Sequence, residues 1–362
     1  MTVPMSAVRL IAASAFLAVA ASAQPGPVAA QSLAEIATMS GPDRQAKLLA
    51  GARKEGEFSL YTTLIVDQAV IPLKNGWEKK YPDIKFSFFR GNQAPVVQRI
   101  VAEARAGKGN GDVVVGSTSD ALDNAQMLQP FTSPEFAAFP KEYIGKNNLW
   151  FTYRLAFYGI GYNTKLVGAD APKTWEDLLN PKFKGRMIWS PSRDTSGPFI
   201  IEHLRQIWGE KKAAEYFAGL AKQDIAKSDA AIRALLDLVI AGEHWILITT
   251  SLNHAVISAG QGAPVWFASP DPVPTRVDHV MLLNNAPHPH AAMLFIDYIL
   301  SREGQDVLSK AEYQVSRTDV DPLPSMVPIM PHLNGRTAKL YAPQDFIGKD
   351  EELMAIFDKI SP

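Results

Sequence analysis

The stretch Thr174–Met187 reads Thr-Trp-Glu-Asp-Leu-Leu-Asn-Pro-Lys-Phe-Lys-Gly-Arg-Met and separates two segments of α/β character. Thr174 is a candidate helix N-cap, with Asp177 at the spacing of a capping box. Pro181 ends this short helix, because proline lacks the amide hydrogen that a helix interior requires. A Lys-Gly-Arg turn then leads into an apolar strand. The stretch therefore predicts where one lobe of the protein ends and another begins.

The segment before this landmark alternates strands and helices. Val113–Val115 is continuously apolar, as expected when both faces of a parallel sheet are covered. Pro72 is predicted to kink the first helix or to lie in its first turn. The predicted order is strand 58–61, helix 64–81, strand 84–90, helix 95–106, strand 113–116 and helix 119–128.

A long apolar strand over 151–163 leads into the landmark and is interpreted as the first crossing between the lobes. A second α/β unit follows, and two later strands return the chain to the first lobe. The pattern predicts strands at 187–190, 245–249, 265–268 and 277–283, and helices at 197–208, 211–221, 229–241, 252–259, 291–300 and 351–360.

Residues 1–30 are predicted to be a secretory signal peptide rather than part of the fold. Arg9 is the only charge, and the apolar run 10–21 is shorter than the roughly 20 residues that a membrane span requires. Small-residue cleavage sites end at Ala23 and at Ala30, and we favour the second. The mature protein is expected to be soluble, exported and monomeric.

Composition excludes several function classes. The 362 residues carry a formal net charge of −1, so no overall charge attracts nucleic acid or anionic membrane. The chain has no cysteine, which removes disulfides, thiolate metal sites and cysteine nucleophiles. The common motifs of hydrolases, zinc proteases and nucleotide-binding enzymes are absent, so an exported enzyme is the less favoured class.

Candidate ligand contacts follow the strands, because open α/β sheets bind ligands beyond the carboxyl ends of their strands. Each of these ends carries hydroxyl or amide side chains, which also cap helices. The candidates are Thr62, Thr63, Asn92, Gln93, Ser117 and Thr118 in the first lobe, and Ser192, Arg193, Thr195, Ser196, Thr249 and Ser251 in the second. The run 190–197 gives the most specific prediction, since it combines the Arg193 guanidinium with hydroxyls and a helix start. This set of groups suits a phosphate, phosphonate or carboxylate.

Two blocks of sequence resemble family 1 extracellular solute-binding proteins. One is Trp-x-Asp-Leu-Leu-x-Pro-Lys-Phe-Lys-Gly-Arg at 175–186, and the other is the helix and Ser-x-x-Gly-Gln turn within 286–305. The chain is most similar to the branch that serves importers of iron(III), polyamines, thiamine and phosphorylated compounds. The resemblance implies a class II periplasmic-binding-protein fold, a solute trapped between two α/β lobes, and delivery to an inner-membrane ABC permease. The expected division is lobe 1 at 31–158 and 267–320, lobe 2 at 159–266, and a wrapping segment at 321–362.

The nature of the solute stays open between a small anion and ferric iron. Ferric-binding relatives place two neighbouring tyrosines in the region that corresponds to 245–254, where this chain has none. Fe³⁺ prefers anionic oxygen ligands, so the departure favours the anion, although His254 and Tyr61 could still contribute to iron binding. His288 and His290 lack a third ligand and are interpreted as the start of a helix. No metal site and no cofactor are therefore predicted, apart from Fe³⁺ as an alternative cargo.

Overall fold

The computed structural model describes residues 1–2, 31–192, 195–346 and 348–362. Most of the predicted signal peptide and the candidate site residue Arg193 lie outside these ranges. Residues Leu33–Pro362 form one compact unit. Among the described helices, none has the length and apolar character needed to cross a membrane.

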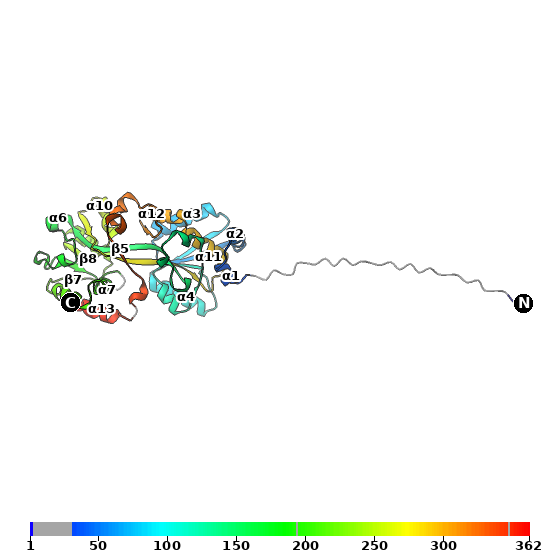
Figure 1. The fold of residues 1–362 in the computed structure, drawn as a ribbon, viewed down its shortest axis with the longest axis horizontal. Helices are drawn as coiled ribbons and strands as arrows, with labels where there is room; N and C mark the ends of the chain where they lie inside the picture. Colours follow the sequence, from blue (N-terminus) through cyan, green and yellow to red (C-terminus); the bar gives the residue numbers. More distant parts are fainter. Residues whose placement is uncertain (3–30, 193–194, 347) are drawn as a thin grey trace. The chain divides into compact units, whose positions relative to one another are not determined.

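Two long strands organise the sheet. β5 (Phe151–Asn163) and β10 (Val273–Leu283) pair in antiparallel fashion and lie in the middle of the strand order β2-β1-β3-β10-β5-β8-β6-β7 (Figure 1). Parallel strands flank them on both sides, β1 beside β2 and β3, and β6 beside β7 and β8. The other strands are β1 (Glu57–Thr62), β2 (Lys85–Arg90), β3 (Val113–Gly116), β4 (Leu128–Gln129), β6 (Met187–Trp189), β7 (Ala226–Lys227), β8 (Ile246–Ser251), β9 (Val265–Ala268), β11 (Gln314–Val315) and β12 (Ala338–Tyr341).

Helices cover the sheet on both sides of the crossing strands, which gives separate hydrophobic cores. One core packs β1 and β3 against α2, α3 and α11, and another packs β6 and β8 against α7, α8 and α13. β5 contributes Phe151 to the first core and Ile160 to the second. The helices are α1 (Leu33–Ala37), α2 (Arg44–Glu55), α3 (Ile71–Lys80), α4 (Gln93–Arg105), α5 (Ser119–Asn124), α6 (Thr164–Val167), α7 (Gly197–Trp208), α8 (Glu210–Leu220), α9 (Ile232–Ala241), α10 (Leu252–Gly260), α11 (Pro289–Leu300), α12 (Arg302–Lys310) and α13 (Asp350–Ile360).

This arrangement confirms the predicted mixed α/β fold with strands that cross between two lobes. The exact boundaries of lobe 1 and lobe 2 stay predictions. The segment after residue 320 is more than a surface wrapping, because β12 pairs with β10 and α13 buries Leu353, Phe357 and Ile360 in the second core.

The landmark Thr174–Met187 folds as two short 3₁₀ turns, at Glu176–Leu179 and Pro181–Phe183, rather than as an α-helix. The capping box is present: the Thr174 amide donates to the Asp177 carboxylate at 2.9 Å, and the Asp177 amide donates to the Thr174 hydroxyl at 3.3 Å. Pro181 follows so soon that no full α-helical turn can continue through it. The predicted capping is confirmed, and the predicted helix is corrected to a shorter form.

Two predicted details of lobe 1 helices are also visible. Pro72 lies in the first turn of α3, directly after a π-helical turn at Val66–Val70. His288 and His290 lie at the start of α11, where their Nδ1 atoms pair with Asp112 at 3.0 Å and with Glu55 at 2.6 Å. Both histidines therefore help to position this helix start, as predicted.

Candidate functional site

A cavity of about 290 Å³ lies where side chains from both lobes meet the crossing strands. β5 contributes Arg154, Ala156 and Tyr158, which alternate along the strand and so lie on one face of it. β10 contributes Asp278. The remaining lining residues are Thr63, Leu64, Ile65, Gln68, Tyr313 and Gln314 from lobe 1, and Thr195, Ile232, Ser251, Asn253, His254 and Ile257 from lobe 2.

Arg154 places a positive charge in this cavity. Its Nε atom lies 2.8 Å from Oδ2 of Asp278, and its guanidinium stacks 4.4 Å from the centre of the Tyr313 ring. Burial alone would lower the pKa of Arg154, but Asp278 and the neighbouring tyrosines raise it above the usual arginine value. The guanidinium therefore stays charged at every physiological pH.

The contact between Arg154 and Asp278 is close in distance but poorly aligned as a hydrogen bond. Nε of Arg154 is a buried donor with no hydrogen-bond partner among the described residues. A buried donor of this kind gains free energy when a suitable acceptor approaches it. The ion pair with Asp278 therefore leaves Nε of Arg154 without a well-formed hydrogen bond.

In lobe 1, the predicted site residues gather at neighbouring strand ends, but only Thr63 lines the cavity. Thr62 is buried and donates its hydroxyl to the Val115 carbonyl at 3.1 Å. Gln93 donates to the Ser117 carbonyl at 2.8 Å and so links the ends of β2 and β3. Asn92 is exposed and lies beside Arg90. Thr118 is buried, and its hydroxyl has no hydrogen-bond partner among the described residues.

In lobe 2, Thr195 and Ser251 line the cavity. The Thr195 hydroxyl lies 2.9 Å from that of Ser192, and Ser251 donates to Oδ1 of Asn253 at 2.5 Å. Thr249 has a structural role, because it is buried and accepts a hydrogen bond from the Trp189 indole at 2.9 Å. These placements leave the ligand-contact role of every predicted site residue a prediction.

At the start of α7, a ligand would meet side-chain hydroxyls rather than unpaired backbone amides. The Ser196 and Gly197 amides already donate to the carbonyls of Ser192 and Ser190, and Pro198 has no amide hydrogen. The Ser196 hydroxyl is buried and has no hydrogen-bond partner in the described part of the chain. An anion near this helix start would therefore meet hydroxyl groups and the partial positive charge of the helix axis.

Sequence reasoning missed the charged centre of the cavity. Arg154 and Asp278 lie within crossing strands, whereas the predicted ligand contacts all lie at strand ends. A signal was present, since Arg154 is the only charged residue of β5 and Asp278 is the only acidic residue of β10. A charge in a mostly apolar crossing strand such as β5 indicates a site, because a buried charge is costly unless it is paired or binds a ligand.

The two residues considered for iron binding differ in their environments. His254 lines the cavity, and burial, followed by the charges of Arg233 and Arg154, lowers its pKa to about 4. Its imidazole is therefore neutral near pH 7. Tyr61 donates its hydroxyl to Glu103 at 2.8 Å, and burial and this carboxylate raise its pKa to about 12. Tyr61 is thus engaged elsewhere and does not line the cavity.

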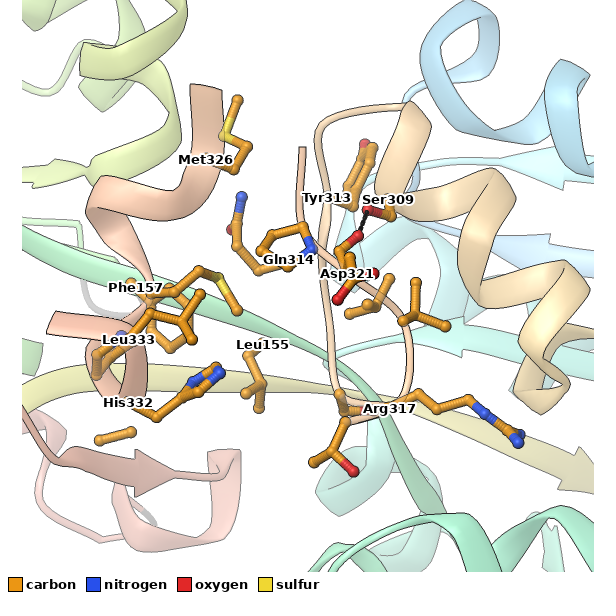
Figure 2. Close-up of a pocket in the computed structure, with 18 of the residues that line it drawn as sticks. Leu155, Phe157, Ser309, Tyr313, Gln314, Arg317, Asp321, Met326, His332 and Leu333 are labelled. Atoms are coloured by element: carbon orange, nitrogen blue, oxygen red, sulfur yellow. Dashed lines mark hydrogen bonds between the residues drawn. The ribbon is translucent and has the colours of Figure 1, made fainter. Parts of the chain in front are cut away.

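A second cavity, of about 560 Å³, lies on the opposite face of β5 (Figure 2). Leu155 and Phe157, which alternate with Arg154 and Tyr158 along the strand, form part of its wall together with Met326. None of the predicted site residues that the structure describes lines this cavity. The first cavity is therefore the candidate ligand site, although Tyr313 and Gln314 line both.

His279 of β10 is predicted to make the stability of the protein depend on pH. It is almost fully buried, with Nδ1 2.9 Å from the Ser119 hydroxyl, and burial, followed by the charge of Arg276, lowers its pKa to about 3. The unfolded imidazole titrates near about pH 6.5. The contribution of His279 to stability is complete above that pH and is lost as the pH falls towards 3, because only the unfolded chain takes up the proton.

We therefore expect the His279→Gln variant to lose about 1.4 kcal/mol per pH unit from the slope of unfolding free energy against pH near pH 5. Urea unfolding at several pH values measures this slope. His203 and His254 also have lowered pKa values, of about 3 and about 4, so part of the slope should remain in the variant. An unchanged slope would contradict the prediction.

The fold and the cavity together define a class: a protein with two α/β lobes that are joined by crossing strands and that line a cavity between them. Residues 110–329 match the family described as bacterial extracellular solute-binding protein, and the chain belongs to that family. The description of this family is that of a binding protein, so the chain is a solute-binding protein rather than an enzyme.

The chain is similar to curated relatives over about two thirds of its length. An uncharacterized protein of Haemophilus influenzae is 27% identical over 252 residues, which cover 64% of this chain and 69% of that protein. A periplasmic protein of Salmonella typhi that is named for binding 2-aminoethylphosphonate is 23% identical over 250 residues, which cover 67% of this chain and 73% of that protein.

Two solved structures share the fold. Iron-bound HitA from Pseudomonas aeruginosa matches with a TM-score of 0.68 and 20% identity, covering 84% of this chain and 99% of HitA. AfuA from Actinobacillus pleuropneumoniae, with fructose-6-phosphate bound, matches with a TM-score of 0.61 and 23% identity, covering 84% of this chain and 95% of AfuA. At these identities the likeness shows the fold, and the fold confirms the predicted architecture.

Proposed function

We propose that this protein is the periplasmic binding component of an ABC importer and that it captures a small solute bearing a phosphate, phosphonate or carboxylate group. The observation that carries the proposal is the Arg154 guanidinium, which lies in a cavity lined by both lobes. Arginine binds planar or tetrahedral oxyanions through paired N–H donors. The hydroxyls of Thr63 and Thr195 supply further donors in the same cavity, which Ser251 also lines.

Binding at this position favours closure of the lobes. A solute that contacts lobe 1, lobe 2 and the crossing strands at once stabilises the closed form more than the open form. The closed form would then be recognised by an inner-membrane permease, and no bond of the solute is made or broken. A signal peptide removed after Ala30 or Ala23 would deliver the protein, as a monomer, to the periplasm.

Two of the similar proteins support an oxyanion-bearing solute. The name of the Salmonella typhi protein specifies a phosphonate, and the AfuA structure contains a sugar phosphate. Both ligands carry a phosphorus oxyanion, which the donors around Arg154 would suit.

Ferric iron is the second candidate, because the cavity contains two tyrosines and one carboxylate. Tyr158, Tyr313 and Asp278 supply oxygen ligands of the kind that Fe³⁺ prefers, and HitA was solved with iron bound. Arg154 weighs against iron, because its guanidinium is ion-paired with Asp278 and stacked on Tyr313. A fixed positive charge among the donors opposes the binding of a trivalent cation.

A thermal-shift panel on ligand-stripped protein tests the two candidates. The panel contains inorganic phosphate, 2-aminoethylphosphonate, fructose-6-phosphate, citrate and iron citrate. A true solute at about 100 times its dissociation constant should stabilise the folded state by roughly 2.7 kcal/mol. Stabilisation by an oxyanion without visible absorbance supports the proposal. A visible absorbance band that forms only with iron citrate supports ferric iron, and no shift with any oxyanion contradicts the proposal.

A further inference from the structure

The fixed charges that line the candidate site cancel each other. Arg154 and Asp278 are the charged residues of the described lining, and their side chains are 18% and 17% exposed, so solvent still reaches both. His254, the other titratable group of the lining besides the tyrosines, is neutral near pH 7 because burial lowers its pKa. The described lining therefore presents one positive and one negative group side by side, and these two charges balance.

A simple oxyanion fits this pair poorly. Asp278 lies directly opposite Arg154 in the register of β5 and β10, with 2.8 Å between Nε and Oδ2. An anion that binds Arg154 therefore lies within a few ångströms of the Asp278 carboxylate. Two like charges at this separation repel, because a partly buried cavity screens them less than bulk water does. Unless the solute compensates for this repulsion, the repulsion offsets much of the binding free energy that Arg154 contributes.

A solute that carries both charges removes this conflict. Its oxyanion can accept from Arg154 while a protonated amine donates to Asp278, so each protein charge gains a partner. The aromatic rings of Tyr158 and Tyr313 line the same space, and aromatic faces attract ammonium groups. Because the two protein charges are adjacent, the amine and the oxyanion of the solute must be separated by only a short linker.

We propose that the solute is a small zwitterion, an amine joined by a short linker to a phosphonate, phosphate or carboxylate, and that Asp278 selects the amine. This inference rests on the proposed function, because it assumes that Arg154 receives the oxyanion. The alternative is that the pair only holds the crossing strands together, in which case a solute without the amine would bind equally well.

The test compares two ligands that differ only in the amine. Calorimetric titrations with 2-aminoethylphosphonate and with ethylphosphonate give an affinity ratio for the unmodified protein, so this arm requires no variant to fold. We expect 2-aminoethylphosphonate to bind at least about tenfold more tightly, since a desolvated charge pair commonly contributes that much. Equal binding of both ligands would overturn the zwitterion but leave the oxyanion site in place.

The Asp278→Asn variant identifies the residue responsible. The ratio should fall to about one in this variant, because the asparagine offers no negative charge to the ammonium group. Asp170→Asn is the matched control, since Asp170 pairs with Lys182 at an exposed surface position, and it should keep the original ratio. A ratio that survives Asp278→Asn overturns the role of Asp278. If neither phosphonate binds but another oxyanion of the panel does, the zwitterion alone is overturned. If no oxyanion of the panel binds, the proposed function falls together with this inference.

Discussion

Replacement of Arg154 by methionine is expected to lower the affinity for an oxyanion-bearing solute by roughly 100-fold or more. The substitution removes the charged donor of the cavity, and it leaves Asp278, 2.8 Å from the lost Nε atom, without its partner. An oxyanion would then meet a carboxylate with no opposing charge. Calorimetric titration with the solute identified in the ligand panel measures the loss.

Two companion variants separate recognition from stability. Arg154→Lys keeps the charge but loses the planar donor pair, so it should retain an intermediate affinity. Arg154→Met combined with Asp278→Asn removes both charges, so it should restore thermal stability without restoring binding. Solute affinity in Arg154→Met equal to that of the unmodified protein would place the binding site elsewhere.

The largest loss of stability is expected from Arg44→Met in lobe 1. Arg44 of α2 and Asp297 of α11 form a buried ion pair, and the Arg44 Nε atom also donates to the Met39 carbonyl at 2.9 Å. The Ser133 hydroxyl donates to the same carboxylate at 2.7 Å. Removing one member of a buried pair leaves an uncompensated charge and costs roughly 3–5 kcal/mol. Urea unfolding monitored by tryptophan fluorescence measures this change.

A surface ion pair provides the control for this prediction. Lys80 pairs with Glu303, and their side chains are 39% and 47% exposed. Lys80→Met should cost no more than about 1 kcal/mol, because solvent screens exposed pairs. Asp297→Asn added to Arg44→Met should recover part of the loss, since the unpaired carboxylate is removed. Similar losses for Arg44→Met and Lys80→Met would contradict the prediction.

The fold followed from the sequence wherever apolar patterning was long and uninterrupted. β5 at 151–163 and α7 at 197–208 have the predicted bounds, because a continuous apolar run and a Gly-Pro start define them clearly. The helix predicted at 64–81 is a π-helical turn followed by α3, since Pro72 allows only a first-turn position. Short segments were less predictable because a few hydrogen bonds decide their form.

The candidate site followed from the sequence only in part, for a geometric reason. The expectation that ligands bind beyond strand ends selects loops that lie near the cavity, but it does not specify which side chain of a loop faces the cavity. Thr62 is buried beneath the strand end while its neighbour Thr63 lines the cavity. Arg154 and Asp278 belong to crossing strands, whose faces depend on how the lobes are joined. The pairing of β5 with β10, which are far apart in the sequence, decides where Arg154 and Asp278 lie. Local sequence patterns do not reveal this pairing.

The alternation along β5 has an evolutionary consequence. Positions 154, 156 and 158 face the candidate ligand site, while Leu155 and Phe157 face the opposite cavity and contribute to a hydrophobic core. Substitutions at the first set can change which cargo is recognised without altering the packing of the second. An insertion of one residue would exchange the two faces and destroy both functions at once. This strand can therefore diversify by point substitution but not by changes in length.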